Sequence, residues 1–491
     1  MLMRTNSNRR DFIKNTATAG IGLTVVPSNV LGGVGRVSPN DKIKVALIGS
    51  GTQALEMLPG WLKRPELQFV SVCDPNRMSY DYPTWGEPNE NRETCGAPGG
   101  REVGRNRINK YYGEKIGKEK YNGCTAYADF RELFEKETGI DAVFVMTPDH
   151  IHATVAIAAM RKKIMVGSHK PIGNFMHETR VAIDTARATG VPTQMFAFQD
   201  PKEHYVVEEW IKQGVIGKVT ELHRWTNRPM WPQGSPFLPS NTPPIPEGFD
   251  WDLWLGPALP RVYSPDYTHT VFRGWYEFGA GCLADMGYYG FWVDWRVLNL
   301  GMPLVAEASS SFTCQVKNFK SLWVKNELSY PHAATLRWEV PVKNSTDSIN
   351  VFWYEGGIKP FSLKALRAKD KTLPEEGVMF VGEKGSILAN YNYQDLELLG
   401  VENSDKVIAS IKIPEVKLTD FNDDMIDSFS GGKESRGSYS NCQIIAEAIC
   451  FGNLAIRINR RLEWDNKNLK VTNVPEANEF VTRKYREGWE L

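Results

Sequence analysis

The chain has 491 residues, a length that suits two domains better than one. Its 58 basic and 58 acidic residues give a formal net charge of zero, so no basic excess indicates nucleic acid and no acidic tail is present. The hydrophobic fraction of 42% is typical of a globular protein, and no apolar run reaches the ~18 residues that a membrane helix needs.

The first 37 residues read as a signal segment and are set apart from the fold. Residues 8–14, Asn-Arg-Arg-Asp-Phe-Ile-Lys, match the twin-arginine motif of proteins that are exported already folded, and a mild apolar run follows at 21–26. We therefore expect the twin-arginine export machinery as a partner, a periplasmic location and no membrane span in the mature protein.

Short apolar runs alternate with helix-like stretches over residues 38–200. This alternation predicts an α/β fold with a Rossmann doubly wound parallel sheet. Residues 75–120 are rich in Gly, Pro, Asn, Arg and Glu, which indicates an insertion after the second strand. The strands are expected at 43–48, 69–73, 142–146, 164–167 and 193–198, and amphipathic helices at 130–137 and 154–161.

Residues 201–491 have a different pattern. Short alternating runs predict an α+β domain with a mixed, largely antiparallel sheet. A Pro- and Trp-rich connection occupies 226–270, and two helices are expected at 421–429 and 442–458. The strands are expected at 219–226, 304–314, 334–340, 348–353, 377–381 and 386–389.

The seven cysteines are odd in number, and no two have C-x-x-C spacing. Neither a metal site nor a disulfide framework is therefore indicated. Buried free thiols that pack as small hydrophobes are expected, and Cys95 with Cys124 is the one pairing to check.

A glycine-rich turn of the form G-x-G-x-x-A follows the first strand. Gly49 permits the tight turn, Gly51 lets the backbone approach a pyrophosphate, and Ala54 allows close packing of helix and strand. The N–H groups of the helix that starts here suit phosphate oxygens. The turn therefore predicts a dinucleotide site, to which the intervening residues Ser50, Thr52 and Gln53 belong.

Asp74 ends the next strand, twenty positions past Ala54, where a carboxylate binds ribose hydroxyls. Its charge repels a 2′-phosphate, so the pattern favours NAD as the cofactor. Arg77 nearby keeps NADP as the alternative.

Two loops follow later strands of the predicted parallel sheet. Thr147-Pro148-Asp149-His150-Ile151-His152 closes one strand and His169-Lys170-Pro171 closes the next. Ligands of such sheets bind outside the carboxyl ends of the strands, so both loops are expected to face the cofactor. A partly buried Lys170 is a natural proton donor or acceptor for an alcohol that is being oxidised.

The order of these motifs resembles the glucose-fructose oxidoreductase and inositol dehydrogenase (Gfo/Idh/MocA) family. The segments 279–287 (Gly-Ala-Gly-Cys-Leu-Ala-Asp-Met-Gly), 380–386 (Phe-Val-Gly-Glu-Lys-Gly-Ser) and 461–478 add to the resemblance. It is strongest to exported members from bacteria that degrade complex carbohydrates. The resemblance implies a substrate bound between the two domains and a homo-oligomer with contacts through the mixed sheet.

The resemblance also implies roles for individual residues. Lys170 matches the lysine of the family's Glu-Lys-Pro motif, the proton shuttle, while His169 stands where the family has Glu. Asp149 stands where the family has Asn. Asp285 matches the aspartate of Asp-x-Gly-x-His, and Tyr288 or Tyr289 takes the place of the histidine that is often paired with the lysine.

Seven of the 15 tryptophans fall between residues 225 and 295. Flat aromatic rings suit the C–H faces of sugars, and Trp231 and Trp275 are the best candidates for substrate contact. Arg228 and Arg273 are candidates for binding substrate hydroxyls or a carboxylate.

These observations predict an exported NAD-dependent oxidoreductase that acts on a sugar or sugar derivative. Hydride passes between a ring carbon and nicotinamide, and the cofactor is held tightly because no free NAD pool is expected outside the cytoplasm. One alternative is an NAD-dependent glycosidase that oxidises its substrate transiently, eliminates the leaving group and then reduces the ring again. The other is a non-catalytic sugar-binding scaffold.

Overall fold

The computed structural model describes residues 41–84, 96–118, 120–197, 202–367, 371–415, 418 and 420–491. Residues 43–491 form one unit by their internal contacts. The twin-arginine segment and Cys95 lie outside the described residues, so the export signal and the pairing of Cys95 with Cys124 stay predictions.

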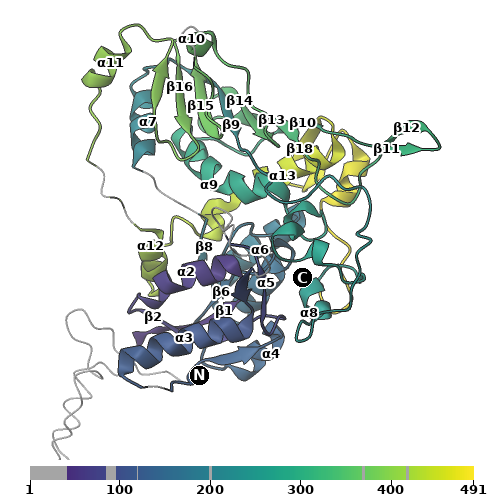
Figure 1. The fold of residues 1–491 in the computed structure, drawn as a ribbon. Coiled ribbons are helices and arrows are strands. Elements are labelled where there is room, and N and C mark those ends of the chain that lie inside the picture. The colour runs from purple at the N-terminus through teal and green to yellow at the C-terminus, as the bar shows by residue number, and fades with distance from the viewer. Residues whose placement is uncertain are drawn as a thin grey trace, which may run out of the picture. The chain divides into compact units, whose positions relative to one another are not determined.

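A six-stranded parallel sheet forms the first part of the fold (Figure 1). All five expected strands are present in this sheet, and its sixth strand, the short edge strand β5, was not expected. The central strands are buried on both faces, which explains their nearly continuous apolar sequences. In sheet order the strands are β5 (Thr125–Tyr127), β2 (Leu67–Cys73), β1 (Ile43–Ile48), β6 (Ala142–Val145), β7 (Met165–Ser168) and β8 (Thr193–Met195).

Helices cover both faces of this sheet, so the predicted doubly wound α/β fold is confirmed. One face packs against α2 (Thr52–Leu62), α3 (Arg101–Ile116) and α12 (Phe421–Phe429). The other packs against α4 (Phe130–Lys136), α5 (His152–Arg161) and α6 (Met176–Thr189).

The predicted insertion 75–120 is only partly an insertion. The strands β3 (Ser79–Tyr82) and β4 (Ala97–Gly99) form a hairpin there, but α3 packs on β2 and β5 as an ordinary crossover helix. The sequence pattern does not indicate α3, because this helix buries only Gly104, Ile108 and Gly113 and these residues do not form an apolar stripe.

A nine-stranded mixed sheet forms the second part, as expected for the α+β domain. Only β14 and β9 pair in parallel, and the other pairs are antiparallel. The sheet order is β17 (Glu397–Leu399), β16 (Ser386–Asn390), β15 (Gly377–Gly382), β9 (Val219–Trp225), β14 (Ser348–Glu355), β13 (Ala334–Pro341), β10 (Val305–Ser310), β18 (Leu462–Asp465) and β19 (Lys470–Val471).

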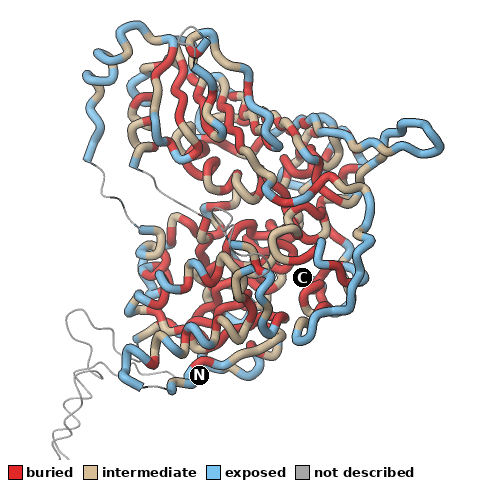
Figure 2. Tube along the Cα trace, in the orientation of Figure 1, coloured by how far each residue is buried: buried red, intermediate tan, exposed pale blue. Residues whose placement is uncertain are grey.

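One expected strand, 304–314, is two strands. It divides into β10 and β11 (Thr313–Lys317), and β11 pairs only with β12 (Lys320–Val324). This hairpin and α11 (Ser404–Ser410) are largely exposed, whereas the strands of both large sheets are mostly buried (Figure 2).

The helix α9 (Gly281–Val297) was not expected from the sequence. It is buried on almost all sides, against α13 (Tyr439–Ile458) and the mixed sheet. It therefore lacks the polar face whose spacing of about 3.6 residues would indicate a helix in the sequence. The other α-helices of the described residues are α7 (Glu203–Lys212), α8 (Trp251–Leu255) and α10 (Lys364–Arg367).

The chain returns to the parallel sheet after residue 420. Gly437 accepts a backbone hydrogen bond from Met195 in β8, and the Tyr439 hydroxyl donates to Ser168 Oγ at 2.7 Å. The helix α13 therefore packs against both sheets, because it contacts β8 of the parallel sheet and also β10 and β13 of the mixed sheet.

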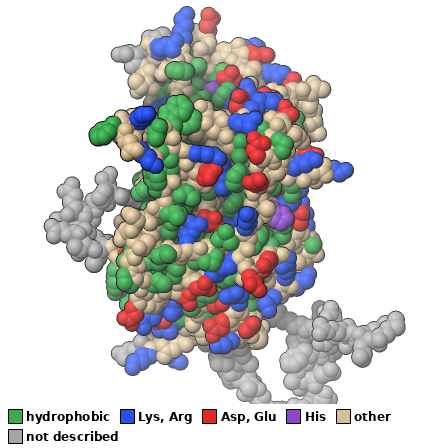
Figure 3. Space-filling model, turned by 90° about the vertical axis from the view of Figure 1, so that its right-hand side faces the viewer, with side chains coloured by type: hydrophobic (Ala, Val, Ile, Leu, Met, Phe, Trp, Pro, Cys, Tyr) green, Lys and Arg blue, Asp and Glu red, His purple; other side chains and the backbone are tan. Residues whose placement is uncertain are grey.

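The surface has no separation of charge on the face drawn in Figure 3, where basic and acidic side chains are interspersed. Among the described residues, no helix combines the length and the apolar character that crossing a bilayer requires.

Candidate functional site

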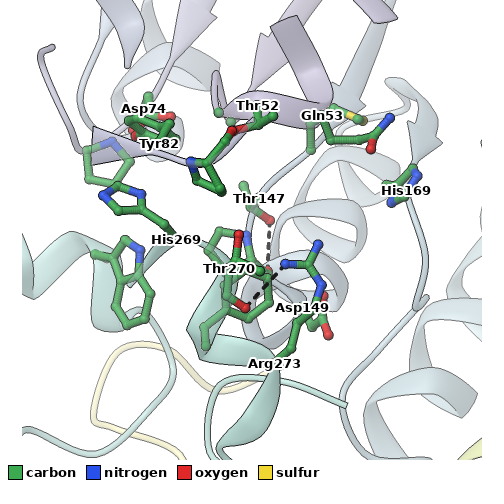
Figure 4. Close-up of a pocket in the computed structure, with 18 of the residues that line it drawn as sticks. Thr52, Gln53, Asp74, Tyr82, Thr147, Asp149, His169, His269, Thr270 and Arg273 are labelled. Atoms are coloured by element: carbon green, nitrogen blue, oxygen red, sulfur yellow. Dashed lines mark hydrogen bonds between the residues drawn. The ribbon is translucent and has the colours of Figure 1, made fainter. Parts of the chain in front are cut away.

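A cleft with about 860 Å³ of empty space, part of it open to solvent, lies at the carboxyl ends of the parallel strands. Figure 4 shows Asp74 and Tyr82 at one end of this cleft, His169 at the other and Thr147 between them. The residues predicted from sequence that line it are Gly49, Gly51, Thr52, Gln53, Asp74, Thr147, Pro148, Asp149, His169, Lys170 and Arg273.

The glycine turn has the geometry that its sequence predicts. Gly49 has φ +91°, and a Cβ atom there would lie 2.5 Å from the backbone carbonyl of Met146. Gly51 has φ −90°, and a Cβ there would meet only the ring of Tyr82, at 3.1 Å. Ala54 is buried beneath the turn, so α2 sits close to β1 and presents its first N–H groups to the cleft.

Asp74 is held at the end of β2 by backbone donors. The N–H of Ser50 donates to Oδ2 and the N–H of Asn76 donates to Oδ1, each at 2.8 Å. Burial raises the pKa of Asp74 above its usual value, and the two N–H bonds oppose that rise. Each oxygen keeps a lone pair for a further donor, as a ribose-binding carboxylate requires.

Arg77 does not reach the cleft. Its side chain is exposed and its nearest acidic partner is Glu247, at 3.8 Å. The alternative that Arg77 binds a 2′-phosphate therefore has no support from its position.

Lys170 lies at the carboxyl end of β7, and only 4% of its side chain is exposed. Its Nζ donates to Asp285 Oδ1 at 2.5 Å, and Arg273 Nε donates to the same oxygen at 3.1 Å. Burial lowers the pKa of Lys170, Asp285 raises it, and Arg273 lowers it. Lys170 and Arg273 together hold the pKa of Asp285 below its usual value in spite of burial, so this carboxylate stays ionised.

The two tyrosines of the Asp285 segment lie on different sides of α9. Tyr289 contacts two residues of the cleft: its hydroxyl lies 3.3 Å from His169 Nε2, and Lys170 Nζ lies 5.5 Å from its ring centre. Tyr288 is fully buried in the core, so it is not a substrate-facing residue. Burial, reinforced by Lys170, holds the pKa of His169 well below its usual value, so the imidazole is neutral.

Two residues of the Thr147–His152 loop have structural partners. His152 is buried, with Nδ1 2.7 Å from the Pro171 carbonyl and Nε2 2.8 Å from the Thr147 carbonyl, so it fixes the two loops together and does not line the cleft. Asp149 lines the cleft but accepts from the Ala280 N–H at 3.1 Å, and burial raises its pKa.

Of the four predicted substrate residues, only Arg273 lines the cleft. Trp231 lies next to it, with the Arg273 guanidinium 5.7 Å from its ring centre. Trp275 is packed in an aromatic cluster, where its Nε1 donates to the Asp266 carbonyl at 2.7 Å. Arg228 pairs with Glu376 at 3.7 Å and does not line the cleft.

Comparison with known proteins agrees with this architecture. The family model described as the oxidoreductase NAD-binding Rossmann fold matches residues 107–196, and the model of the oxidoreductase C-terminal alpha/beta domain matches residues 210–297. The chain belongs to the Gfo/Idh/MocA oxidoreductase family. It therefore has the NAD-binding domain of that family, as the fingerprint predicted.

Two curated relatives are both named glycosyl hydrolase family 109 protein. The one from Stenotrophomonas maltophilia is 23% identical over 215 residues, which are 44% of this chain and 41% of the relative. The one from Saccharopolyspora erythraea is 24% identical over 203 residues, which are 37% of each chain. The chain thus spans about two fifths of the length of the curated relatives it matches.

Among solved structures, the WlbA dehydrogenase from Bordetella pertussis, in complex with NADH and UDP-GlcNAcA, is similar with a TM-score of 0.52. It is 13% identical, and the match covers 86% of this chain and 99% of that chain. This likeness shows the fold.

The residues of this Gfo/Idh/MocA cleft fit a dinucleotide. Gly49 and Gly51 bring bare backbone to the start of α2, and the carboxylate of Asp74 follows at the end of β2. Ser50 does not line the cleft, because its fully buried Oγ lies beside Gly104 of α3. An anion at the helix start and a ribose at Asp74 would satisfy the N–H groups of α2 and the Asp74 carboxylate.

Sequence reasoning missed the residues that reach the cleft from the second half of the fold. His269 lies 4.1 Å, centre to centre, from the ring of Tyr82 and 3.0 Å from Asp81 Oδ2. Trp254 and Thr270 also line the cleft. No motif marks these residues, because they come from the irregular connection 226–270 and are placed by packing.

Proposed function

We propose that this protein is an NAD-dependent enzyme that oxidises a hydroxyl-bearing ring carbon of a sugar or sugar derivative. One observation carries the proposal. The cleft that holds the dinucleotide cradle also holds Lys170, a buried amine whose pKa is lowered and which is paired with Asp285. A buried acid–base group beside a nicotinamide site is what alcohol oxidation needs.

NAD, when bound, supplies the acceptor for the hydride that leaves the ring carbon. Lys170 in its neutral form takes the hydroxyl proton, and its ammonium form returns a proton in the reverse direction. Asp285 holds Lys170 Nζ in place through the 2.5 Å contact, and Arg273 steadies Asp285 from the other side. Tyr289 stays protonated because burial raises its pKa, so its hydroxyl serves as a hydrogen-bond donor or acceptor.

Sugar as the substrate class is supported by the cleft and by the relatives. Arg273 lines the cleft, where its guanidinium N–H groups suit the hydroxyls of a sugar. The curated relatives are named as glycosyl hydrolases, and one protein of similar fold was crystallised with a UDP-linked sugar acid.

The curated relatives also favour a second candidate, a glycosidase that is redox-neutral overall. In that reaction, hydride loss at C3 gives a ketone, which acidifies the C2 proton. A base removes that proton, and the C1 leaving group departs with a proton. Water then adds across C1 and C2, with its hydroxyl going to C1 and a proton to C2. The hydride returns to C3 and a proton to the C3 oxygen, so the net change is hydrolysis. Lys170 would handle the C3 hydroxyl proton in both candidates.

We further propose that the enzyme is exported folded to the periplasm, holds its NAD tightly and forms a homo-oligomer. The twin-arginine sequence at 8–14 supports export. Tight retention follows from export, because an exported enzyme is cut off from the cytoplasmic NAD pool.

The first test is to denature freshly purified protein and identify any released nucleotide by mass spectrometry. Stoichiometric NAD is the expected result. Sugars and glycosides are then supplied to the holoprotein, and products are followed by NMR, with Lys170→Met as the inactive control. An oxidised sugar supports the oxidoreductase, and free sugar with no net oxidation supports the glycosidase. Protein that neither contains nor binds NAD would leave the sugar-binding scaffold as the better account.

A further inference from the structure

A large cavity lies apart from the cofactor cleft, where the C-terminal segment meets the connection that leads to α9. It has about 1280 Å³ of empty space, part of it open to solvent, and it shares no lining residue with the cleft. Its walls come from segments within 259–277, 327–328 and 479–484, together with the residue before α6 and the last turn of α13. This is enough room for a small organic molecule.

Aromatic rings hold Arg457 in the wall of this cavity. Its guanidinium carbon lies 3.9 Å from the ring centre of Phe480 and 4.4 Å from that of Tyr276. Rings above a guanidinium contact its flat faces, so the N–H donors around its edge stay available. No hydrogen bond or ion pair joins the Arg457 side chain to any other described residue. The guanidinium is therefore a donor group that still needs an acceptor.

The charge of Arg457 also lacks a counter-charge at close range. Burial lowers the pKa of Arg457 below its usual value, although Tyr276, Tyr330 and two carboxylates oppose this effect. Arg224 shows the contrast: burial acts on it in the same way, but its ion pair with Asp294 raises its pKa above the usual value. A guanidinium stays protonated in both settings. Arg457 is thus a partly buried cation that an anion in the cavity would stabilise.

One of the two carboxylates that act on Arg457, Glu277, already serves other cations. Its Oε2 lies 3.6 Å from Arg261 Nη2, and its Oε1 lies 3.9 Å from Arg483 Nη1. Arg483 is also held by Glu178, whose Oε1 lies 2.6 Å from its Nε, and its Nη2 donates to the Glu277 carbonyl at 3.2 Å. Arg261 and Arg483 thus have acidic partners in this part of the chain.

The other carboxylate, Glu327, pairs with Lys325, and both side chains are largely exposed. Glu479 and Lys484 also line the cavity, and they are exposed and opposite in charge. The lining as a whole contains four basic and three acidic residues. The positive charge left without a partner is that of Arg457, and a monoanion matches it.

Apolar side chains make up much of the remaining wall. These side chains belong to Phe175, Leu259, Tyr276, Leu328 and Phe480. The Phe175 ring is fixed by Arg483, whose guanidinium carbon lies 4.8 Å from the ring centre. Aromatic walls suit a flat ring or the C–H face of a sugar, whereas a small hydrated anion gains little from them.

We propose that this cavity binds an organic monocarboxylate that carries a ring. The carboxylate accepts two hydrogen bonds from the guanidinium edge of Arg457, which matches its planar geometry, and the ring packs against the aromatic wall. Sugar acids and aromatic acids share this chemistry. The site is separate from the cofactor cleft, so the proposal goes beyond the oxidoreductase function and does not depend on it.

Saturation-transfer NMR on the purified full-length protein measures its affinity for matched ligands. Benzoate is compared with neutral benzamide, glucuronate with neutral methyl glucoside, and acetate supplies a carboxylate without a ring. The titrations are made at about pH 7, where the carboxylates are ionised. At least one ring carboxylate is expected to bind at least about 10-fold more tightly than its neutral counterpart and than acetate. Binding of benzoate alone identifies an aromatic acid as the class, and binding of glucuronate alone identifies a sugar acid.

Substitutions of Arg457 locate the ligand. Arg457→Met keeps a side chain that packs between the two rings but removes the charge, so the affinity for the ring carboxylate is expected to fall about 10- to 100-fold. Arg457→Lys keeps the charge without the planar fork and is expected to lie between the wild type and Arg457→Met. Arg460→Met is the matched control and is expected to change nothing, because Arg460 pairs with Glu476 at the surface and does not line the cavity. If circular dichroism shows that Arg457→Met does not fold, weaker binding by Arg457→Lys supports the proposal and unchanged binding overturns it.

Three further results would overturn the proposal. The first is that neither ring carboxylate binds. The second is an affinity of Arg457→Met equal to that of the wild type, which would place the ligand elsewhere. The third is acetate that binds as tightly as the ring carboxylates, which would remove the role of the aromatic wall. None of these results bears on the cofactor, which is tested separately by the nucleotide released on denaturation.

Discussion

Adding one methyl group at either glycine of the fingerprint turn is expected to separate folding from cofactor binding. At Gly49 the new Cβ would lie 2.5 Å from both the C and O atoms of Met146 and 2.7 Å from the N of Thr147. These are backbone atoms at the end of a buried strand, so they cannot move aside. At Gly51 the new Cβ would meet only the Tyr82 side chain, at 3.1 Å.

Gly49→Ala is therefore expected to reduce the free energy of unfolding, whereas Gly51→Ala is expected mainly to weaken cofactor binding. Gly49→Ala places a side chain at φ +91°, which costs about 1–3 kcal/mol, and the overlap with Met146 adds about 1–3 kcal/mol. Gly51→Ala leaves φ at −90°, where alanine is unstrained, and replaces a glycine N-cap by a poorer alanine N-cap at a cost of about 1 kcal/mol. The same methyl group at Gly51 fills the space through which a pyrophosphate reaches the start of α2.

Urea unfolding of the nucleotide-free protein and a titration with NAD measure both effects. Gly49→Ala is expected to lose about 2–6 kcal/mol of unfolding free energy. Gly51→Ala is expected to stay within about 1 kcal/mol of the wild type and to bind NAD at least about 10-fold more weakly. Wild-type NAD affinity in Gly51→Ala would refute the assignment of this turn as the phosphate cradle, and wild-type stability in Gly49→Ala would refute the turn geometry.

Three further changes test the buried charges. Asp285→Asn removes the carboxylate that raises the pKa of Lys170, so the rising limb of the rate of NADH formation against pH is expected to move about 1–3 pH units lower, and an unmoved limb contradicts Lys170 as the base. Burial raises the pKa of Glu355 from 4.5 to about 7. Between pH 4.5 and about pH 7 the folded protein therefore keeps a proton on Glu355 that the unfolded chain loses. The free energy of unfolding falls as the pH rises through this range. Glu355→Gln is therefore expected to be up to about 3 kcal/mol more stable than the wild type in urea at about pH 8, and equal to it near pH 4, where both states of the wild type are protonated. Asp294→Asn leaves the fully buried guanidinium of Arg224 without its counter-charge, so thermal and urea unfolding are expected to show a loss of about 3–5 kcal/mol, and a loss below about 1 kcal/mol contradicts the pairing.

The parts of the fold that were predictable are those with a visible period or a steric requirement. The buried strands show as apolar runs, and α12 was placed at its observed bounds because its apolar residues face one side. The helices α3 and α9 were missed for opposite reasons. The helix α3 buries almost no large side chains, and α9 buries nearly all of its side chains, so neither helix has an amphipathic pattern.

The site residues that could be predicted are those that closely follow a strand of the parallel sheet. Gly49, Asp74 and Lys170 each follow a parallel strand, and all three reach one cleft. Residues from the irregular connection could not be assigned in this way. The environments of His269 and Trp254 depend on how that connection packs across the parallel sheet, and spacing along the chain carries no information about that packing.

The two departures from the family's motifs form one structural change. His169 stands where the family has Glu, Tyr289 stands where it has His, and 120 positions separate them in sequence. In the structure His169 Nε2 and the Tyr289 hydroxyl are 3.3 Å apart, so the two departures are in contact in this protein. A carboxylate and an imidazole at the same two positions would also be able to share a hydrogen bond beside Lys170, whose Nζ lies 5.5 Å from the Tyr289 ring.

This reasoning makes the two positions interdependent. His169→Glu alone puts a carboxylate against a phenol whose pKa burial already raises, and Tyr289→His alone puts two imidazoles together. Each single change is expected to lower the rate of sugar oxidation, and the double change is expected to recover most of the loss, which a double-mutant cycle measures as a coupling energy of about 0.5–3 kcal/mol. Strictly additive effects would mean that the two residues act separately. Their replacement would then be two unrelated events in a site whose proton path is carried by Lys170 and Asp285 alone.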